Sequence, residues 1–144
     1  MTHQVQAYTS HLQHSLIPEL EGTRRHLSAV DFDISEYDSL LGRIKLLEDE
    51  KSPSLDTMSE LGAGVWVHTR IPDHDQLTLD LGVAGLHADM SLGEATAYIK
   101  SLLAILKKRQ EVLSQKEEFL VWQMGQFHHI LSAPPESNVA SSAL

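Results

Sequence analysis

Apolar residues recur every seven positions through the C-terminal half of the chain. Six positions in register carry this repeat: Leu92, Ile99, Leu106, Leu113, Leu120 and Phe127. Further apolar residues widen the stripe at its two ends: Ala95, Leu102, Leu103, Met124, Ile130 and Leu131. In the middle, the companion positions are polar: Arg109, Gln110, Lys116 and Glu117. A sustained heptad repeat is typical of a coiled coil, so we predict one long helix that packs against another helix.

Local sequence marks both ends of this helix. Ser91 and Glu94 have the spacing of a capping box, in which each side chain accepts a hydrogen bond from the other residue's backbone amide. Pro134 and Pro135 cannot continue a helix. We therefore predict a helix over residues 91–131, followed by a disordered tail from 132 to 144 that is rich in Ser, Ala and Pro.

A second, less regular heptad pattern runs through the N-terminal half. Its main positions are Leu20, Leu27, Ile34 and Leu41, with Val30, Tyr37 and Ile44 as companions. Before Pro18 the apolar positions follow a shifted register: Val5, Tyr8, Leu12 and Leu16. Proline starts or kinks a helix, so we expect a bend near residue 18. Helix breakers at Ser52 and Pro53 end the pattern, which predicts a first helical segment over residues 1–52.

Between the helical segments the apolar period changes from seven to two. The alternating segments are residues 65–71, 77–81 and 86–90, with a weaker one at 58–61. Turns rich in Gly, Pro and Asp separate them at residues 62–64, 72–75 and 82–85. Alternation predicts strands with one apolar side, and hence two β-hairpins within residues 53–90. The expected fold class is α+β: a long antiparallel two-helix coiled coil with two β-hairpins between the helices.

The apolar sides of these strands need a cover that two helices are not expected to provide. A small isolated sheet is marginally stable in water, and its edges invite pairing with other chains. We therefore expect this region to be an oligomerisation surface, completed by the same region of other chains in a closed barrel. The residues assigned to this surface are Val65, Val67, Ile71, Leu77, Leu79, Leu81, Leu86 and Met90.

Two large aromatic residues lie off the main heptad stripe of the second helix. Phe119 and Trp122 are therefore expected to face away from the partner helix, and clustered exposed aromatics mark contact sites. Together with neighbouring apolar residues they form the candidate client-binding tip: Tyr8, Leu12, Phe119, Trp122, Met124 and Phe127. The alternative is a well-packed end of the coiled coil, which explains most of these residues equally well.

Composition excludes several classes of function. The chain carries 11 Lys and Arg against 20 Asp and Glu, a net charge of −9, so it repels phosphate backbones and we expect no nucleic-acid partner. No apolar run approaches the roughly 18 residues of a spanning helix, so no membrane partner is expected either. The polar N-terminus and the absence of cysteine fit a soluble cytoplasmic protein, with the nucleus as a further location.

No pattern of reactive residues indicates catalysis. The chain lacks a nucleophile elbow, a phosphate-binding glycine loop and a zinc-protease helix motif. Its nine histidines match no known metal-ligand spacing, and no thiolate is available. His128 and His129, for example, point about 100° apart on a helix. We expect no enzyme, no cofactor and no metal site, with the histidines on the protein surface.

This order of elements resembles the α-class subunits of the prefoldin family, which have two hairpins where β-class subunits have one. The segment Glu60–Asp73 is similar to the family's Leu-Gly turn, apolar strand and Pro-Asp turn. Residues 77–82 and Leu92-Gly93-Glu94-Ala95 continue the likeness. Between Asp80 and Ala95 the chain is most similar to the ubiquitously-expressed-transcript type, a paralogue of prefoldin subunit 5. One departure is the turn Gly82-Val83-Ala84-Gly85, where many members have glycine-aromatic pairs.

The resemblance implies a hetero-hexamer of α- and β-class subunits whose hairpins form a double barrel. In this family the coiled-coil tips hold non-native client proteins and pass them to the cytosolic chaperonin without ATP. The ubiquitously-expressed-transcript type implies a prefoldin-like complex with RuvB-like ATPases and transcription cofactors. We expect a co-chaperone subunit, and a coiled-coil scaffold or transcription cofactor that binds native proteins is the alternative.

Overall fold

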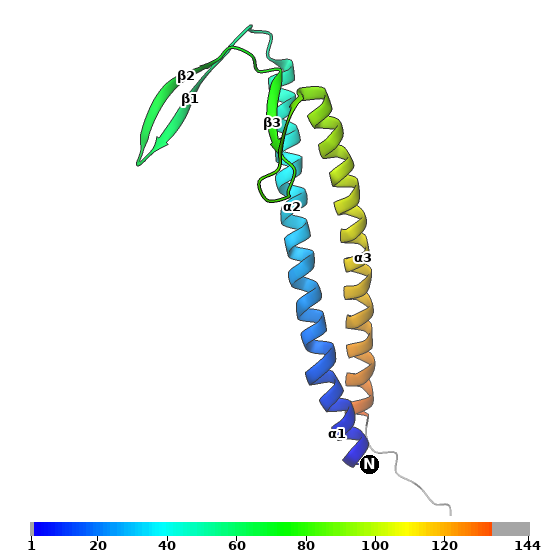
Figure 1. Cartoon of the computed structure of the whole chain (residues 1–144). Helices are drawn as coiled ribbons and strands as arrows, with labels where there is room; N and C mark the ends of the chain where they lie inside the picture. Colours follow the sequence, from blue (N-terminus) through cyan, green and yellow to red (C-terminus); the bar gives the residue numbers. More distant parts are fainter. Residues whose placement is uncertain (1, 134–144) are drawn as a thin grey trace, which may run out of the picture. The chain divides into compact units, whose positions relative to one another are not determined.

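The computed structural model describes residues 2–133, which form helical segments at both ends of the chain and two β-hairpins between them in sequence (Figure 1). This order of elements confirms the predicted α+β fold. The chain divides into two compact units, residues 1–30 with 109–144 and residues 31–108. The predicted disordered tail lies outside the described residues, except for Ser132, the last residue of the C-terminal helix, and Ala133.

The N-terminal helical segment changes its winding just before Pro18. Helix α1 (Thr2–His11) passes into a π-helical turn, η1 (Leu12–Leu16), and then into α2 (Ile17–Asp49). The amide of Ile17 donates to the carbonyl of Leu12, five residues earlier. Pro18 has no amide hydrogen, and in an α-helix its ring would clash with the carbonyl four residues back. The wider π-turn accommodates both constraints where the sequence predicts a bend.

The π-turn also accounts for the shifted register of the apolar residues. Leu12, Leu16 and Leu20 are spaced four and four, one residue more than the three-four alternation of a heptad repeat. A π-turn takes up that extra residue, so all three side chains reach the same core with Leu120. Four half-buried residues complete the core of the first unit: Ile17, Met124, Phe127 and Leu131.

The core of the second unit combines both long helices with one hairpin. Its buried residues are Ile44, Leu79, Leu92, Ala95, Ile99 and Leu103. Helix α3 (Leu92–Ser132) enters this core immediately after its N-terminus. There the Ser91 amide donates to Glu94 Oε2 at 3.1 Å and the Glu94 amide donates to Ser91 Oγ at 3.3 Å. The predicted capping box is thus confirmed, and it positions the first turn of α3.

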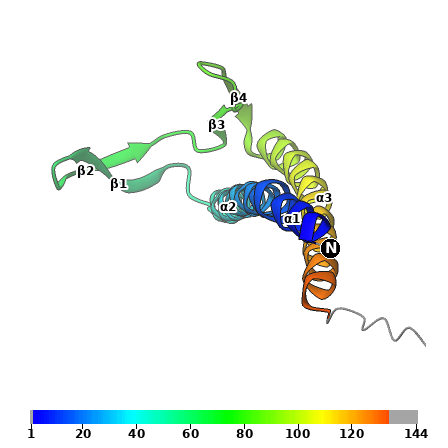
Figure 2. The same ribbon diagram turned by 90° about the horizontal axis from the view of Figure 1, so that it is seen from below.

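The four strands form two separate antiparallel sheets of two strands each. Their bounds are β1 (Leu55–Gly62), β2 (Val65–Ile71), β3 (Gln76–Asp80) and β4 (His87–Ser91). Within the second unit, the β1–β2 hairpin extends away from the helices, whereas the β3–β4 hairpin lies against them (Figures 1 and 2). The two hairpins therefore have different environments, although both arise from the same alternating pattern.

Several strand boundaries differ from the predicted ones by one to three residues, and two of these differences have a clear local reason. β1 begins before residue 58 because Asp56 and Thr57 pair with Arg70 and Thr69 of β2. Pairing with β2 thus extends a strand whose alternation of apolar and polar residues is weak. β4 begins only at His87, because Leu86 belongs to the preceding turn: its amide donates to the Val83 carbonyl at 2.9 Å. These differences change the strand lengths and leave the hairpin topology as predicted.

Candidate functional site

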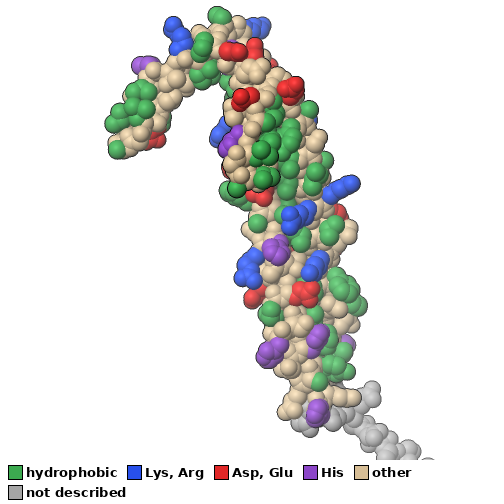
Figure 3. Space-filling view, in the orientation of Figure 1, with side chains coloured by type: hydrophobic (Ala, Val, Ile, Leu, Met, Phe, Trp, Pro, Cys, Tyr) green, Lys and Arg blue, Asp and Glu red, His purple; other side chains and the backbone are tan. Residues whose placement is uncertain are grey.

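The β1–β2 hairpin exposes most of its apolar side chains to solvent. Val65 and Trp66 expose 53% and 55% of their surface, and Met58, Leu61 and Val67 are also exposed. Figure 3 shows hydrophobic side chains gathered on this hairpin. Neither hydrophobic core of the described residues includes a residue of this hairpin. The hairpin therefore offers an apolar surface that another protein can cover.

Polar pairs between the two strands hold the register of this hairpin. On one side, Arg70 donates to both carboxylate oxygens of Asp56 at 2.8 and 3.3 Å, and this hydrogen bonding raises the pKa of Arg70. On the other side, Thr69 Oγ1 donates to Ser59 Oγ at 2.9 Å. Because side chains alternate along a strand, Thr69 shares its side with three of the predicted oligomerisation residues. They are Val65, Val67 and Ile71.

The apolar side of the β3–β4 hairpin is covered by the chain's own helices. Leu79 is buried, and Leu77 and Met90 pack against the same core as Ile44 and Ile99. The expectation that both hairpins need cover from other chains is therefore wrong for this one. The physical reason is size: with only five residues in each strand, the apolar side is narrow enough to pack on a pair of helices.

The predicted oligomerisation residues thus fall into two groups. The exposed group consists of Val65, Val67 and Leu86. The half-buried or buried group consists of Ile71, Leu77, Leu79, Leu81 and Met90. Only the exposed group can contact another chain while the packing within the second unit stays as it is. A role of these residues in assembly stays a prediction.

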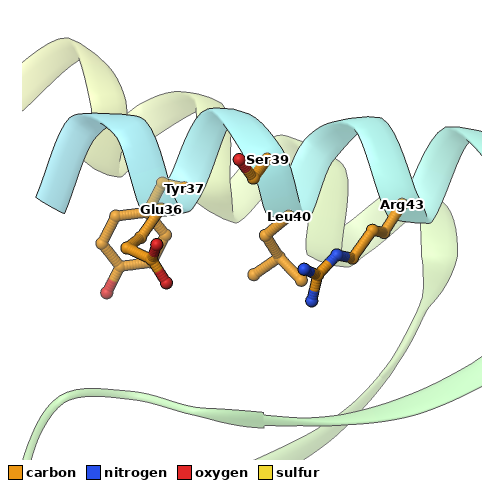
Figure 4. Close-up of a pocket in the computed structure, with 5 residues that line it drawn as sticks. All are labelled: Glu36, Tyr37, Ser39, Leu40 and Arg43. Atoms are coloured by element: carbon orange, nitrogen blue, oxygen red, sulfur yellow. The ribbon is translucent and has the colours of Figure 1, made fainter. Parts of the chain in front are cut away.

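A shallow, open hollow lies along α2 in the second unit. Five residues line it: Glu36, Tyr37, Ser39, Leu40 and Arg43. The side chains of Glu36, Tyr37, Leu40 and Arg43 extend from one side of the helix (Figure 4). Burial raises the pKa of Tyr37, and the neighbouring carboxylate of Asp33 raises it further. Since Tyr37 and Leu40 also pack against the core of this unit, we interpret the hollow as an edge of that core.

In the first unit, Phe119 and Trp122 form an exposed aromatic pair. They expose 56% and 58% of their surface. Their ring centroids are 5.9 Å apart and the ring planes are 24° from parallel, so the rings stack on each other. A stacked pair of this kind presents a large rigid apolar area with little side-chain freedom left to lose on binding. This is the strongest candidate contact site of the first unit.

The other residues of the predicted client-binding tip have mainly structural contacts. Leu12 is buried, and Met124 and Phe127 pack around it. The ring of Tyr8 contacts that of Phe127 edge-on, with centroids 5.7 Å apart, and His11 contacts the same ring at 5.5 Å. The alternative of a well-packed coiled-coil end therefore describes Leu12, Met124 and Phe127, whereas Tyr8 stays 39% exposed beside the ring of Phe127.

Further apolar residues of α3 are exposed and lie outside the predicted tip, among them Ile130 and Val112. Ile130 was assigned to the buried stripe, but it is exposed because the stripe passes through Phe127 and Leu131, and consecutive residues on a helix point about 100° apart. Val112 is exposed as well. Its spacing of seven residues from Phe119 is the sequence signal that could have identified it.

The polar gap in the middle of the α3 stripe is filled by ion pairs to the first helical segment. Arg24 Nε lies 2.6 Å from Glu117 Oε1, and Lys116 Nζ lies 3.0 Å from Glu19 Oε1. Sequence reasoning could not identify these partners, because they lie about a hundred residues away on another helix. The polar positions of the stripe therefore contribute to pairing of the helices instead of interrupting it.

Other kinds of site receive no support from the geometry. Across residues 2–133, the side chains of His, Asp and Glu nowhere gather in a group of three or more that suits a metal ion. The expectation that the histidines lie on the surface is wrong for His74, which is buried. Nor does any helix in this part of the chain combine the length and apolar character needed to cross a membrane. The two surfaces that stand out are both apolar and exposed, which is typical of protein-binding sites.

Comparison with known proteins gives a consistent result. A family model described as prefoldin subunit matches residues 16–135. The protein UXT homolog of Dictyostelium discoideum is 27% identical over 112 residues, which is 78% of this chain and 69% of that protein. The cryo-EM structure of filamentous PFD from Methanocaldococcus jannaschii superposes with a TM-score of 0.63 at 21% identity, covering 92% of this chain and 100% of that one. At that identity the structural likeness shows the fold alone.

Proposed function

Because this chain belongs to the prefoldin family, we propose that it is an α-class subunit of a hetero-oligomeric prefoldin or prefoldin-like co-chaperone. In this role it binds other proteins and catalyses no reaction. Family membership confirms the resemblance found in the sequence, and the likeness to the protein UXT homolog supports a subunit of that type.

The exposed β1–β2 hairpin is the observation that carries the proposal. An isolated two-stranded hairpin is marginally stable in water, and its edges carry unpaired backbone groups. Hairpins of other prefoldin-type subunits would cover Val65 and Val67 and pair with these edges, as strands do when a barrel closes. The similar archaeal protein is described as filamentous, so that fold supports an assembly there. We assign β1–β2 to contacts between subunits.

The aromatic pair on α3 is assigned a different role, that of holding client proteins. Phe119 and Trp122 are exposed and belong to the first unit, whereas the hairpins belong to the second. The two surfaces share no residue, so a variant of one leaves the side chains of the other unchanged. Several subunits that each hold a client weakly give strong overall binding by avidity, without ATP hydrolysis. Non-native proteins are the expected clients, and the chaperonin or RuvB-like ATPases are the expected further partners.

A second candidate function is a scaffold or transcription cofactor that binds native proteins. The likeness to the protein UXT homolog favours this candidate, since the ubiquitously-expressed-transcript type implies such partners. The co-chaperone binds non-native proteins, whereas the scaffold binds native ones. An assay with a denatured client protein therefore distinguishes the two candidate functions.

Two double variants of the full chain, co-expressed with β-class prefoldin subunits, test both assignments. Val65→Ser with Val67→Ser is expected to abolish incorporation into the complex, measured by light scattering after size-exclusion chromatography. Phe119→Ser with Trp122→Ser is expected to keep incorporation and to weaken suppression of the aggregation of denatured citrate synthase. Each variant is the control for the other. If the hairpin variant assembles normally, the assembly role is wrong, and unchanged suppression by the aromatic variant contradicts client holding and favours the scaffold.

A further inference from the structure

Helix α3 has a second apolar stripe in the first unit, on a side different from the one that faces the core. Four exposed residues form it, and we call them the α3 outer face: Val112, Phe119, Trp122 and Ile130. At 3.6 residues per turn, these positions fall within about 80° of one another around the helix. Figure 3 shows hydrophobic side chains along the part of the molecule where α3 lies. Four apolar residues on one side of a helix differ from singly scattered surface residues, which need no explanation.

The spacing of the α3 outer face matches a helical partner. Val112 and Phe119 are seven residues apart, and Trp122 follows three residues later, which are the a and d spacings of a coiled-coil seam. Gln115 and Gln126 occupy the intervening positions and carry no charge. An amphipathic helix that docks on another helix presents its own anchors at the same i, i+3 or i+4, i+7 spacing. The pattern therefore favours a helix as the bound segment.

The aromatic pair provides the central anchor of this face. Phe119 and Trp122 stack with centroids 5.9 Å apart, so their rings act as one apolar area about one helical turn long. Trp and Tyr residues in central, well-packed positions contribute most of the binding energy in protein interfaces. Val112 and Ile130 extend the contact along the helix in both directions. A bound helix of about three heptads would reach all four residues.

Charged residues beside the stripe indicate the charge that a partner helix should carry. Glu111 and Glu118 are seven residues apart and form an acidic column along one border of the α3 outer face. Gln115 Nε2 donates to Glu111 Oε1 at 2.9 Å. On the other border, Lys116 is already paired with Glu19 at 3.0 Å. Lys107 lies one turn before Glu111 on this border, so the charge left for a partner is negative from Glu111 onward, where Lys or Arg at heptad spacing would complement it.

We propose that the α3 outer face docks amphipathic helical segments of client proteins that carry a column of Lys or Arg beside their apolar side. This inference rests on the proposed role of the aromatic pair in holding clients, and it names the class of segment that is held. It distinguishes a preference for helices with basic flanks from general adhesion to unfolded chains.

Tryptophan fluorescence of the full chain tests the proposal directly. The chain has two tryptophans, so in a Trp66→Phe background the emission reports on Trp122 alone. The probes are three synthetic peptides of about three heptads: one with Leu at a and d and Lys at the flanking positions, one with Glu in place of Lys, and one with the Lys sequence scrambled. The Lys peptide is expected to shift the emission to the blue and to bind at least about tenfold more tightly than the other two.

A charge reversal supplies the matched control. Glu111→Lys with Glu118→Lys is expected to exchange the preference, so that the Glu peptide binds more tightly than the Lys peptide. Both side chains are exposed, and circular dichroism checks that the fold is retained. Equal binding of the Lys and Glu peptides, or tight binding of the scrambled peptide, overturns the proposal. Self-association of the chain that Phe119→Ser abolishes also overturns it, because a second copy then occupies this face.

Failure of this inference differs from failure of the proposed function. If the peptides bind alike while Phe119→Ser with Trp122→Ser still weakens suppression of citrate synthase aggregation, the helix preference is wrong and client holding stands. If suppression is unchanged in that variant, client holding itself is wrong.

Discussion

Arg24 Nε lies 2.6 Å from Glu117 Oε1, which joins two helices of the first unit across 93 residues of sequence. Glu117 occupies a polar position within the apolar stripe of α3 and is only partly exposed. Charge-assisted hydrogen bonds of this length are stronger than neutral ones. The pair therefore adds a polar contact between the two helices at a position where the α3 stripe carries no apolar side chain.

Removal of this ion pair is expected to destabilise the chain slightly. Arg24→Ala should lower the free energy of unfolding by about 0.5–1 kcal/mol, the range of partly exposed pairs, and the difference should shrink in 1 M NaCl because salt screens it. Urea denaturation at fixed protein concentration measures the change. Arg25→Ala, at the neighbouring exposed position, is the control. An equal loss in both variants would show that the pair contributes nothing specific.

Ile99 and Ile105 provide a matched test of the core of the second unit. Ile99 has no exposed surface, whereas Ile105 on the same helix is exposed. Ile99→Ala should cost about 2–5 kcal/mol, because it removes apolar contacts and leaves a cavity. Ile105→Ala should change stability by less than about 0.5 kcal/mol. Both values follow from urea denaturation, and a small effect of Ile99→Ala would contradict the assigned core.

The π-turn can be tested by deletion of one residue. In a Pro18→Ala background without the exposed Ser15, Leu12, Leu16 and Leu20 would regain three-four spacing, so a continuous α-helix would bury all three without a clash of the proline ring. We expect this deletion to be tolerated, with a thermal midpoint close to that of the parent chain by circular dichroism. Deletion of the exposed Ala29 should lower the midpoint clearly, because it rotates the following apolar residues out of the seam. The reverse order of midpoints would contradict this explanation of the π-turn.

Ionisation of Tyr37 is expected to lower the stability of the fold at alkaline pH. Its pKa is raised by burial and by the nearby carboxylate of Asp33, so the fold favours the neutral phenol. The stabilisation is present below the unfolded pKa of about 10 and is lost as the pH rises through the higher folded value. Absorbance at alkaline pH should show one of the three tyrosines ionising late, and Tyr37→Phe should remove that component. Tyr8→Phe is the control, and loss of the late component in that variant instead would contradict the assignment.

Local periodicity predicted most of the fold. The heptad stripe around Leu106 and the alternation from Val65 to Ile71 are direct consequences of helix and strand geometry, so they can be read from neighbouring residues. The capping box of Ser91 and Glu94 was found for the same reason. The exposure of Val112 also follows from neighbouring residues, because its spacing of seven from Phe119 places both on one side of the helix, off the main stripe.

The sequence by itself determined the order of helices and hairpins, the family and the aromatic pair, because each depends on residues close together in the chain. Only the tertiary structure decided that Leu79 is covered by the chain's own helices while Val65 is exposed, and that Glu117 pairs with Arg24. Both hairpins carry the same alternating pattern, and a pattern does not specify which distant segment will lie against it. Burial of a hairpin by helices and ion pairing between helices both require residues that are remote in sequence to lie close in space. That closeness arises only when the chain folds.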